Sequence, residues 1–258
     1  MIVELKGKKA LVTGGSKGIG LAIAEEFALA GAQVTLVARN ENTLKEASES
    51  LHGSGHSYVG LDFSQPDEAL GELALFLQNH PIDILVNNTG GPAAGPIASA
   101  DWEAFNMGLQ MHLRMSHSLA QLTLPNMKAN QYGRIINIIS TSIKIPIPGL
   151  GVSNTVRGAM ASWAKTLAHE VGKDGITVNN ILPGFINTDR LASIISSKAE
   201  KQSMSEEDVV KQLISWIPAG RFGEAHELGK YAAFLASDNA SYINGTSLQI
   251  DGGRTGSI

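Results

Sequence analysis

The stretch from Lys8 to Gly31 constrains the fold of this chain more than any other part of it. Lys8 to Val12 is a short strand with an apolar centre, and the glycine-rich turn from Thr13 to Gly20 follows at once. Residues 21–30 then repeat apolar side chains at helical spacing up to Gly31, which can cap the helix. Such a turn lets the backbone approach a phosphate, whose charge the free N–H groups of the first helical turn stabilise. The stretch therefore predicts a nucleotide-binding site.

The rest of the chain alternates strands with helices. Further strands are expected at residues 33–38, 57–61, 82–86, 134–139, 176–182 and 245–250, with helical patterns between them. The chain has 258 residues, 43% of them hydrophobic, which suits one α/β domain with a full core. We predict a single Rossmann-type domain over residues 1–258, a doubly wound parallel sheet of about seven strands with helices on both faces.

Three motifs resemble those of the short-chain dehydrogenase/reductase family. They are the turn TGGSKGIG at 13–20, NNTG at 87–90, where Thr89 replaces the family's alanine, and PGFINT at 183–188. The similarity runs from about residue 5 to the end of the chain. It implies an oxidoreductase that uses a nicotinamide dinucleotide, with a polar helical lid over the substrate at about residues 188–218.

The predicted cofactor site lies where the strands end. Ligands of parallel sheets bind at the carboxyl ends of the strands, where Thr13, Arg39, Asp62 and Asn88 all fall. Asp62 can alternatively cap a helix. The resemblance implies this set of cofactor-binding residues: Thr13, Gly14, Ser16, Lys17, Gly18, Ile19, Gly20, Arg39, Asp62, Phe63, Asn88, Gly90, Arg157, Pro183, Gly184, Ile186 and Thr188.

The end of the second strand favours NADP(H) over NAD(H). An acidic residue there would bind the ribose hydroxyls, whereas an arginine suits a 2′-phosphate. Ala38 offers no carboxylate, and Arg39 follows it, with Lys17 as a second cation in the glycine turn. The alternative is that both are ordinary solvated surface cations.

The catalytic positions depart from the family pattern of Asn, Ser and a Tyr-x-x-x-Lys pair. Ser140 occupies the serine position, but Ser153 and Arg157 stand where the tyrosine and lysine are expected. His112 falls at the asparagine position. A serine hydroxyl is much less acidic than the family's tyrosine, and an arginine stays protonated near neutral pH. The resemblance thus implies a non-standard catalytic set.

One substitute for the missing proton donor lies just after the fifth strand. If the chain stays extended there, Ser140, Ser142 and Lys144 point to one side, because strand side chains alternate. Lys144 is then a candidate acid or base. The alternatives are a solvated loop lysine and, for His112, a histidine packed in a helix.

Three functions are compatible with these residues. The first is an NADP(H)-dependent carbonyl reductase or alcohol dehydrogenase, resembling the branch labelled 3-oxoacyl-acyl-carrier-protein reductase-like. The second is a catalytically silent NADP(H)-binding sensor or scaffold. The third is a non-redox isomerase or dehydratase on the same fold.

Composition bears on partners and location. The net charge is −4 and there is no cysteine, so we expect no nucleic-acid partner and no thiolate metal site, and the scattered histidines indicate no other metal site. No basic leader precedes an apolar run and no apolar stretch could span a bilayer, so we expect a cytoplasmic protein without a membrane partner. Surplus apolar residues on the helices at 102–129 and 153–171 predict a homodimer or homotetramer.

Overall fold

The computed structural model describes residues 2–257, and its centre is one sheet of seven parallel strands. In chain order they are β1 (Lys9–Thr13), β2 (Gln33–Ala38), β3 (Ser57–Gly60), β4 (Ile84–Asn87), β5 (Gly133–Ile138), β6 (Ile176–Pro183) and β9 (Ser247–Ile250). Their order across the sheet is β3-β2-β1-β4-β5-β6-β9. The predicted doubly wound fold is confirmed, with its switch point between β1 and β4.

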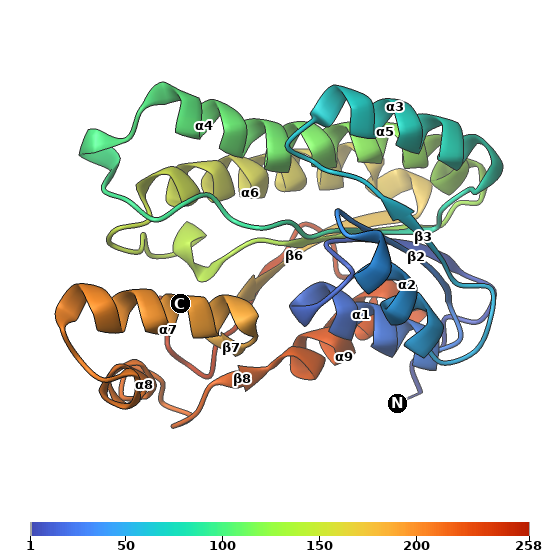
Figure 1. Cartoon of the computed structure of the whole chain (residues 1–258). Coiled ribbons are helices and arrows are strands. Elements are labelled where there is room, and N and C mark those ends of the chain that lie inside the picture. Colours follow the sequence, from blue (N-terminus) through green and yellow to red (C-terminus); the bar gives the residue numbers. More distant parts are fainter. Residues whose placement is uncertain (1, 258) are drawn as a thin grey trace.

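Helices cover both faces of the sheet (Figure 1). One layer holds α1 (Gly18–Leu29), α2 (Glu41–Ser50) and α9 (Ala225–Ala236), and the other α3 (Pro66–Asn79), α4 (Trp102–Leu109), α5 (Met115–Ala129) and α6 (Gly151–Val171). Neighbouring strand residues face opposite sides. Val12 therefore packs in the core with Phe27, while Leu11 packs in the other core with Leu73.

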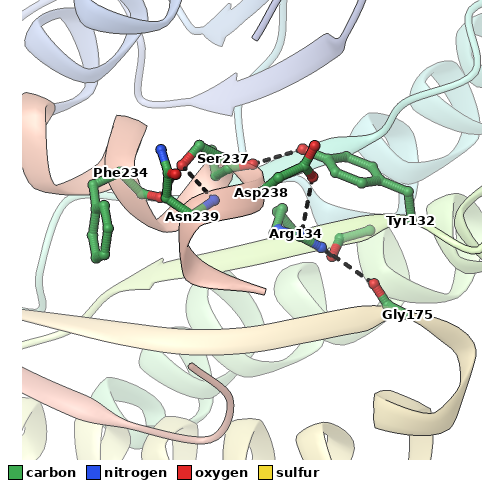
Figure 2. Close-up of polar contacts among 9 residues, drawn as sticks. Tyr132, Arg134, Gly175, Phe234, Ser237, Asp238 and Asn239 are labelled. Atoms are coloured by element: carbon green, nitrogen blue, oxygen red, sulfur yellow. Dashed lines mark hydrogen bonds and ion pairs between the residues drawn. The ribbon is translucent and has the colours of Figure 1, made fainter. Parts of the chain in front are cut away.

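A buried cation fastens the amino end of β5. Arg134 is only 3% exposed, and its Nη1 donates to the carbonyl oxygens of Gly133 at 2.9 Å and Gly175 at 3.2 Å. Its Nη2 lies 3.6 Å from Oδ1 of Asp238, and its guanidinium lies over the Tyr132 ring (Figure 2). The Tyr132 hydroxyl donates to the Ala236 carbonyl, and burial raises the pKa of Tyr132 to about 12. This cluster ties β5 to β6 and to the end of α9.

Two short strands close the expected lid segment at both ends. β7 (Ile186–Asn187) pairs in parallel with β8 (Gly223–Glu224), a pairing that the sequence does not reveal. Between them lie α7 (Asp189–Gln202) and α8 (Glu206–Ile214). These two helices share a small core of their own, built on Leu191, Ile195, Ala199, Val209 and Leu213.

The helix expected over 102–129 is interrupted by a π-helical turn at Gln110–Arg114, between α4 and α5. A π-turn takes an extra residue, and such turns are frequent at functional sites. It places His112 in the interior, at 3% exposure. Within residues 2–257, no helix has both the length and the apolar character needed to cross a membrane.

Candidate active site

Thr13 and Asn88 join the carboxyl ends of β1 and β4. The Thr13 hydroxyl donates to the carbonyl oxygens of Val86 and Asn88 and accepts from the Asn88 backbone N–H at 2.9 Å. The Asn88 side-chain amide donates to the carbonyl oxygens of Thr13 and Gly14 at 3.2 and 3.3 Å. Asn88 thus fixes the position of the glycine turn relative to the sheet.

The glycine turn leaves no room for side chains. A Cβ on Gly14, whose φ is +60°, would lie 2.7 Å from Nδ2 of Asn88, and one on Gly20 would collide with the Gly14 carbonyl. No side chain caps the N-terminus of α1, which begins at Gly18. Its first N–H groups face the carboxyl edge of the sheet without a side-chain acceptor, and such groups hold phosphate. The turn therefore fits a dinucleotide pyrophosphate.

Other residues of the predicted set surround this turn. Thr188 lies beside Gly18, and Gly184 lies against the backbone of Asp251. Ser16 is half-buried, Ile19 packs partly against the core, and Ile186 is buried. Pro183 ends β6.

Asp62, Phe63 and Gly90 of the predicted cofactor-binding set differ in the groups that they leave free to contact a ligand. Oδ1 of Asp62 accepts from the Ser64 backbone N–H at 2.9 Å, so this carboxylate closes a local turn and does not cap α3. The Phe63 side chain packs in the core, which leaves only its backbone to meet a ligand. Gly90 is exposed, and a side chain there would meet nothing.

The two predicted 2′-phosphate cations are both exposed. Nζ of Lys17 donates to Oδ2 of Asp189 at 3.0 Å, which links the glycine turn to the first residue of α7. Arg39 is exposed beyond β2. Both side chains are thus accessible from solvent at the predicted cofactor edge.

The segment after β5 corrects the expectation of an extended chain. Residues Thr141–Ile143 form a 3₁₀ turn, because the Ser140 hydroxyl caps it by accepting from the Ser142 backbone N–H at 3.1 Å. The alternation of strand side chains ends at Ser140. Ser142 is consequently buried and Lys144 is exposed, so the two do not share a face as predicted.

Arg157 is buried at the carboxyl end of β5. It extends from α6 with 8% exposure, and its Nη1 donates to the Ile138 carbonyl at 2.9 Å. Burial, assisted by the charge of Arg190, lowers the pKa of Arg157 to about 10. Ser153, four residues earlier on the same helix, is half-buried. The helix thus presents Ser153 and Arg157 on one face.

His112 is packed in the interior beside Arg157. Burial, with a smaller contribution from the Arg157 charge, lowers the pKa of His112 to about 3, so the imidazole is neutral. Nε2 of His112 is buried and has no hydrogen-bond partner among residues 2–257. A neutral imidazole has one donor and one acceptor nitrogen, so the role of Nε2 depends on the tautomer.

Three buried polar atoms without partners in the described chain belong to the lining of one small cavity. They are Nε2 of His112, Nε of Arg157 and Oδ1 of Asn87, and the cavity is about 10 Å³. The set comprises a donor on Arg157, an acceptor on Asn87 and a ring nitrogen of His112 that can take either role. A cavity of this size is about the smallest that holds a water molecule.

A ladder of amide side chains, which the sequence analysis missed, leads to this cavity. Asn87 donates to Asn137 at 2.8 Å, Asn137 to Asn180 at 2.9 Å, and Asn180 to the Ser247 hydroxyl at 2.9 Å. All four are aligned in register across β4, β5, β6 and β9. The sequence feature that could have revealed this ladder is an asparagine within each of three otherwise apolar strands.

Comparison with known proteins agrees with this geometry. The sequence model described as Enoyl-(Acyl carrier protein) reductase matches residues 14–255. The chain is 36% identical over 252 residues to 3-oxoacyl-[acyl-carrier-protein] reductase of Haemophilus influenzae, covering 96% of this chain and 98% of that protein. It is 35% identical over 256 residues to a tropinone reductase homolog of Arabidopsis thaliana, covering 98% and 91%.

Among solved structures, L-sorbose reductase from Gluconobacter frateurii, complexed with NADPH and L-sorbose, superposes with a TM-score of 0.94. The identity is 32%, and the match covers 100% of both chains.

Proposed function

Because the chain belongs to the short-chain dehydrogenase/reductase family of oxidoreductases, we propose that it transfers hydride between NADP(H) and a carbonyl or alcohol group of a small molecule. The observation that carries the proposal is the glycine turn, where a Cβ on Gly14 or Gly20 would collide with the neighbouring backbone. Thr13, which begins this turn, and the buried Arg157 line the same small cavity. Bound NADPH would supply the hydride.

Each group of proposed cofactor residues binds a different part of NADP(H). The N–H groups at the start of α1 bind the pyrophosphate, and the turn from Pro183 to Thr188 lies on the nicotinamide side. Lys17 and Arg39 bind the 2′-phosphate, because both are exposed cations at the matching edge. Charge-assisted bonds of this kind contribute about 1.5–3 kcal/mol each. We expect at least about tenfold tighter binding of NADPH than of NADH, and a reversed preference in Arg39→Asp; equal affinities in the unmodified protein would contradict this choice.

The proposed catalytic set is Ser140, Ser142, Lys144, Ser153, Arg157 and His112. The hydroxyls of Ser140 and Ser153 orient the carbonyl, and Arg157 supplies positive potential where negative charge develops on oxygen. A single water molecule among Asn87, His112 and Arg157 would give each of their unpartnered atoms a hydrogen bond and so position the guanidinium.

Lys144 remains the proposed proton donor, since it combines solvent exposure with a place just after the Ser140 turn. Lys144→Ala should lower kcat by about 10²–10⁴, the usual contribution of a general acid, with little change in NADPH affinity. If turnover is unchanged in Lys144→Ala and falls in His112→Gln, the proton instead arrives through the interior water.

The deciding experiment follows hydride from NADPH deuterated at the transferred position into a panel of ketones and aldehydes. Deuterium in the alcohol product supports the reductase. NADPH binding without turnover of any carbonyl or alcohol would favour a sensor or scaffold. Product formation with no change in NADPH would favour an isomerase or dehydratase.

We further propose that the chain assembles as a homodimer or homotetramer through the layer of α4, α5 and α6. Trp102 and Met107 of α4 leave 75% and 52% of their surfaces exposed, and large apolar groups of this kind are normally covered. A monomer in light scattering at micromolar concentration would contradict the assembly.

A further inference from the structure

A second and larger cavity lies next to the Ser140 turn. Its volume is about 210 Å³, and it is lined by Thr141, residues 145–148, Trp216, Arg254 and Thr255. These residues come from three places: the segment after β5, the end of the lid beyond α8, and the C-terminal segment. Figure 1 shows the lid helices on the side of the sheet where the segment after β5 also lies. The cavity is therefore bounded by fixed parts of the sheet edge and by the lid.

The cavity adjoins the proposed site of hydride transfer on both sides. Thr141 directly follows Ser140 in the 3₁₀ turn. Across the cavity, the Arg254 guanidinium lies 4.5 Å from the centre of the Phe185 ring, and Phe185 belongs to the turn after β6. A molecule with its carbonyl near Ser140 could thus extend a second group toward Arg254.

Most of the lining is apolar and unusually exposed. Ile145 and Trp216 each leave 47% of their surface exposed, and Pro146 and Pro148 lie beside them. Among the described residues of the lining, Arg254 alone is charged. Pockets that combine an apolar wall with a single charge bind apolar ligands and orient them by the charge.

The Arg254 guanidinium is held against the Phe185 ring, but no carboxylate among the described residues neutralises its charge. Within residues 2–257 no carboxylate lies within ion-pairing distance of it, and its Nε is buried without a hydrogen-bond partner. Arg114 and Arg221, by contrast, each pair with a carboxylate. Stacking on Phe185 restricts the guanidinium, and a restricted guanidinium suits two parallel hydrogen bonds to a planar anion.

We propose that this cavity selects the substrate, and that Arg254 binds its carboxylate; the substrate class is a small oxo acid with an apolar body. The inference rests on the proposed reductase function. A volume of about 210 Å³ is below the 300–1,000 Å³ typical of pockets for drug-sized ligands, which favours a small free acid over a long carrier-bound chain.

The test uses the full chain with NADP⁺ and measures binding by calorimetry. The probes are α-, β-, γ- and δ-oxo acids carrying phenyl or branched alkyl groups, each beside its methyl ester. We expect at least one acid to bind at least about tenfold more tightly than its ester, as expected for charge-assisted hydrogen bonds. Arg254→Met should bring this ratio close to one, and Arg254→Lys should keep part of it, because lysine offers charge without the planar fork.

Lys211→Met is the matched control. It removes a cation from the lid that pairs with Glu207 and does not line the cavity, so the acid-to-ester ratio should persist. Equal binding of every acid and ester, or a preference that survives in Arg254→Met, would overturn the proposal. Phosphate monoesters of matched shape that bind more tightly than the acids would overturn the assignment of a carboxylate. Tight, Arg254-dependent binding of acids that are not reduced when NADPH is supplied would instead refute the reductase and leave the anion site standing.

Discussion

Two buried arginines lie at opposite ends of β5, and the groups around their guanidinium ions differ. Arg134 at the amino end has a carboxylate partner, Asp238, and two backbone carbonyls for its Nη1. Arg157 at the carboxyl end has one carbonyl, no carboxylate among the described residues, and a second cation, Arg190, close enough to lower its pKa.

The difference supports the proposal that Arg134 is a structural cation and Arg157 a functional one. Burying a charge is costly unless it is paired, and the chain supplies the partner only for Arg134. Burial, with a smaller contribution from the charge of Arg190, lowers the pKa of Arg157 to about 10, as expected for a buried guanidinium without a carboxylate partner. A buried cation with a perturbed pKa and no carboxylate partner is typical of sites that bind or stabilise an anion. Replacing each arginine in turn by methionine tests whether the two have different roles.

Arg157→Met should have the largest effect, and it should fall on catalysis. Methionine fills similar space without charge, so the field on the developing oxyanion is lost and kcat should drop by about 10²–10³. Stability should change by no more than about 1 kcal/mol, because the lost hydrogen bond is offset by removal of an unpaired buried charge. Steady-state kinetics and urea unfolding of the same preparation check both parts; a large loss of stability with unchanged kcat would contradict the assignment.

Arg134→Met should show the opposite pattern. It leaves the buried carbonyls of Gly133 and Gly175 without their donor, which costs roughly 2–4 kcal/mol of unfolding free energy. The ion pair itself adds little, because the Asp238 side chain is 88% exposed. Activity per folded molecule should stay near normal. Should Asp238→Asn destabilise the chain as much as Arg134→Met does, the pair and not the carbonyls would hold this end of the sheet.

The contrast between the two arginines also shows what the sequence could predict. The glycine turn was predictable because Gly14 and Gly20 are required by contacts within a few residues and one neighbouring strand. Both arginines, however, appear in the sequence as single cations within apolar segments. The partner of Arg134 lies far along the chain, so only the fold shows which one is paired.

The region after β5 could not be predicted for a different reason. Ser140 can continue a strand or cap a turn, and these choices are close in energy. Because Ser140 caps the turn, Lys144 is exposed to solvent and Ser142 is buried. The alternation of strand side chains had predicted that both would point to the same side. Likewise β7 and β8 have two residues each, too few for any periodicity to show.

The pH dependence of stability tests the environment of His112, which lines the same cavity as Arg157. Its folded pKa of about 3 lies below the ordinary histidine value of 6.5, so between these values the unfolded chain binds a proton that the folded chain does not. Stability from this group is full above about pH 6.5 and falls as the pH decreases toward 3, by about 1.4 kcal/mol per pH unit. From pH 7.5 to pH 5, the protein should therefore lose about 2 kcal/mol more than His112→Gln does. Parallel urea-unfolding profiles for the two proteins would show that His112 is not held neutral.

The smallest expected effect concerns Lys17, an exposed cation that pairs with Asp189. Lys17 and Asp189 form a pair at 3.0 Å with side chains 73% and 78% exposed, and pairs of this kind contribute only about 0.2–1 kcal/mol. In the proposed cofactor site, Asp189 would compete with the 2′-phosphate for Lys17, and its negative charge would also repel the phosphate. Asp189→Asn should therefore raise affinity for NADPH by about two- to fivefold and leave affinity for NADH unchanged. Fluorescence titrations at low and high salt check this, because added salt should shrink the gain in NADPH affinity.

Glu207→Gln is the control. It breaks the exposed pair with Lys211 in the lid and should change the affinity for neither cofactor. An equal gain for NADPH and NADH would mean that Asp189 acts on the lid and not on the phosphate, and Lys17 would then lose its place in cofactor selection.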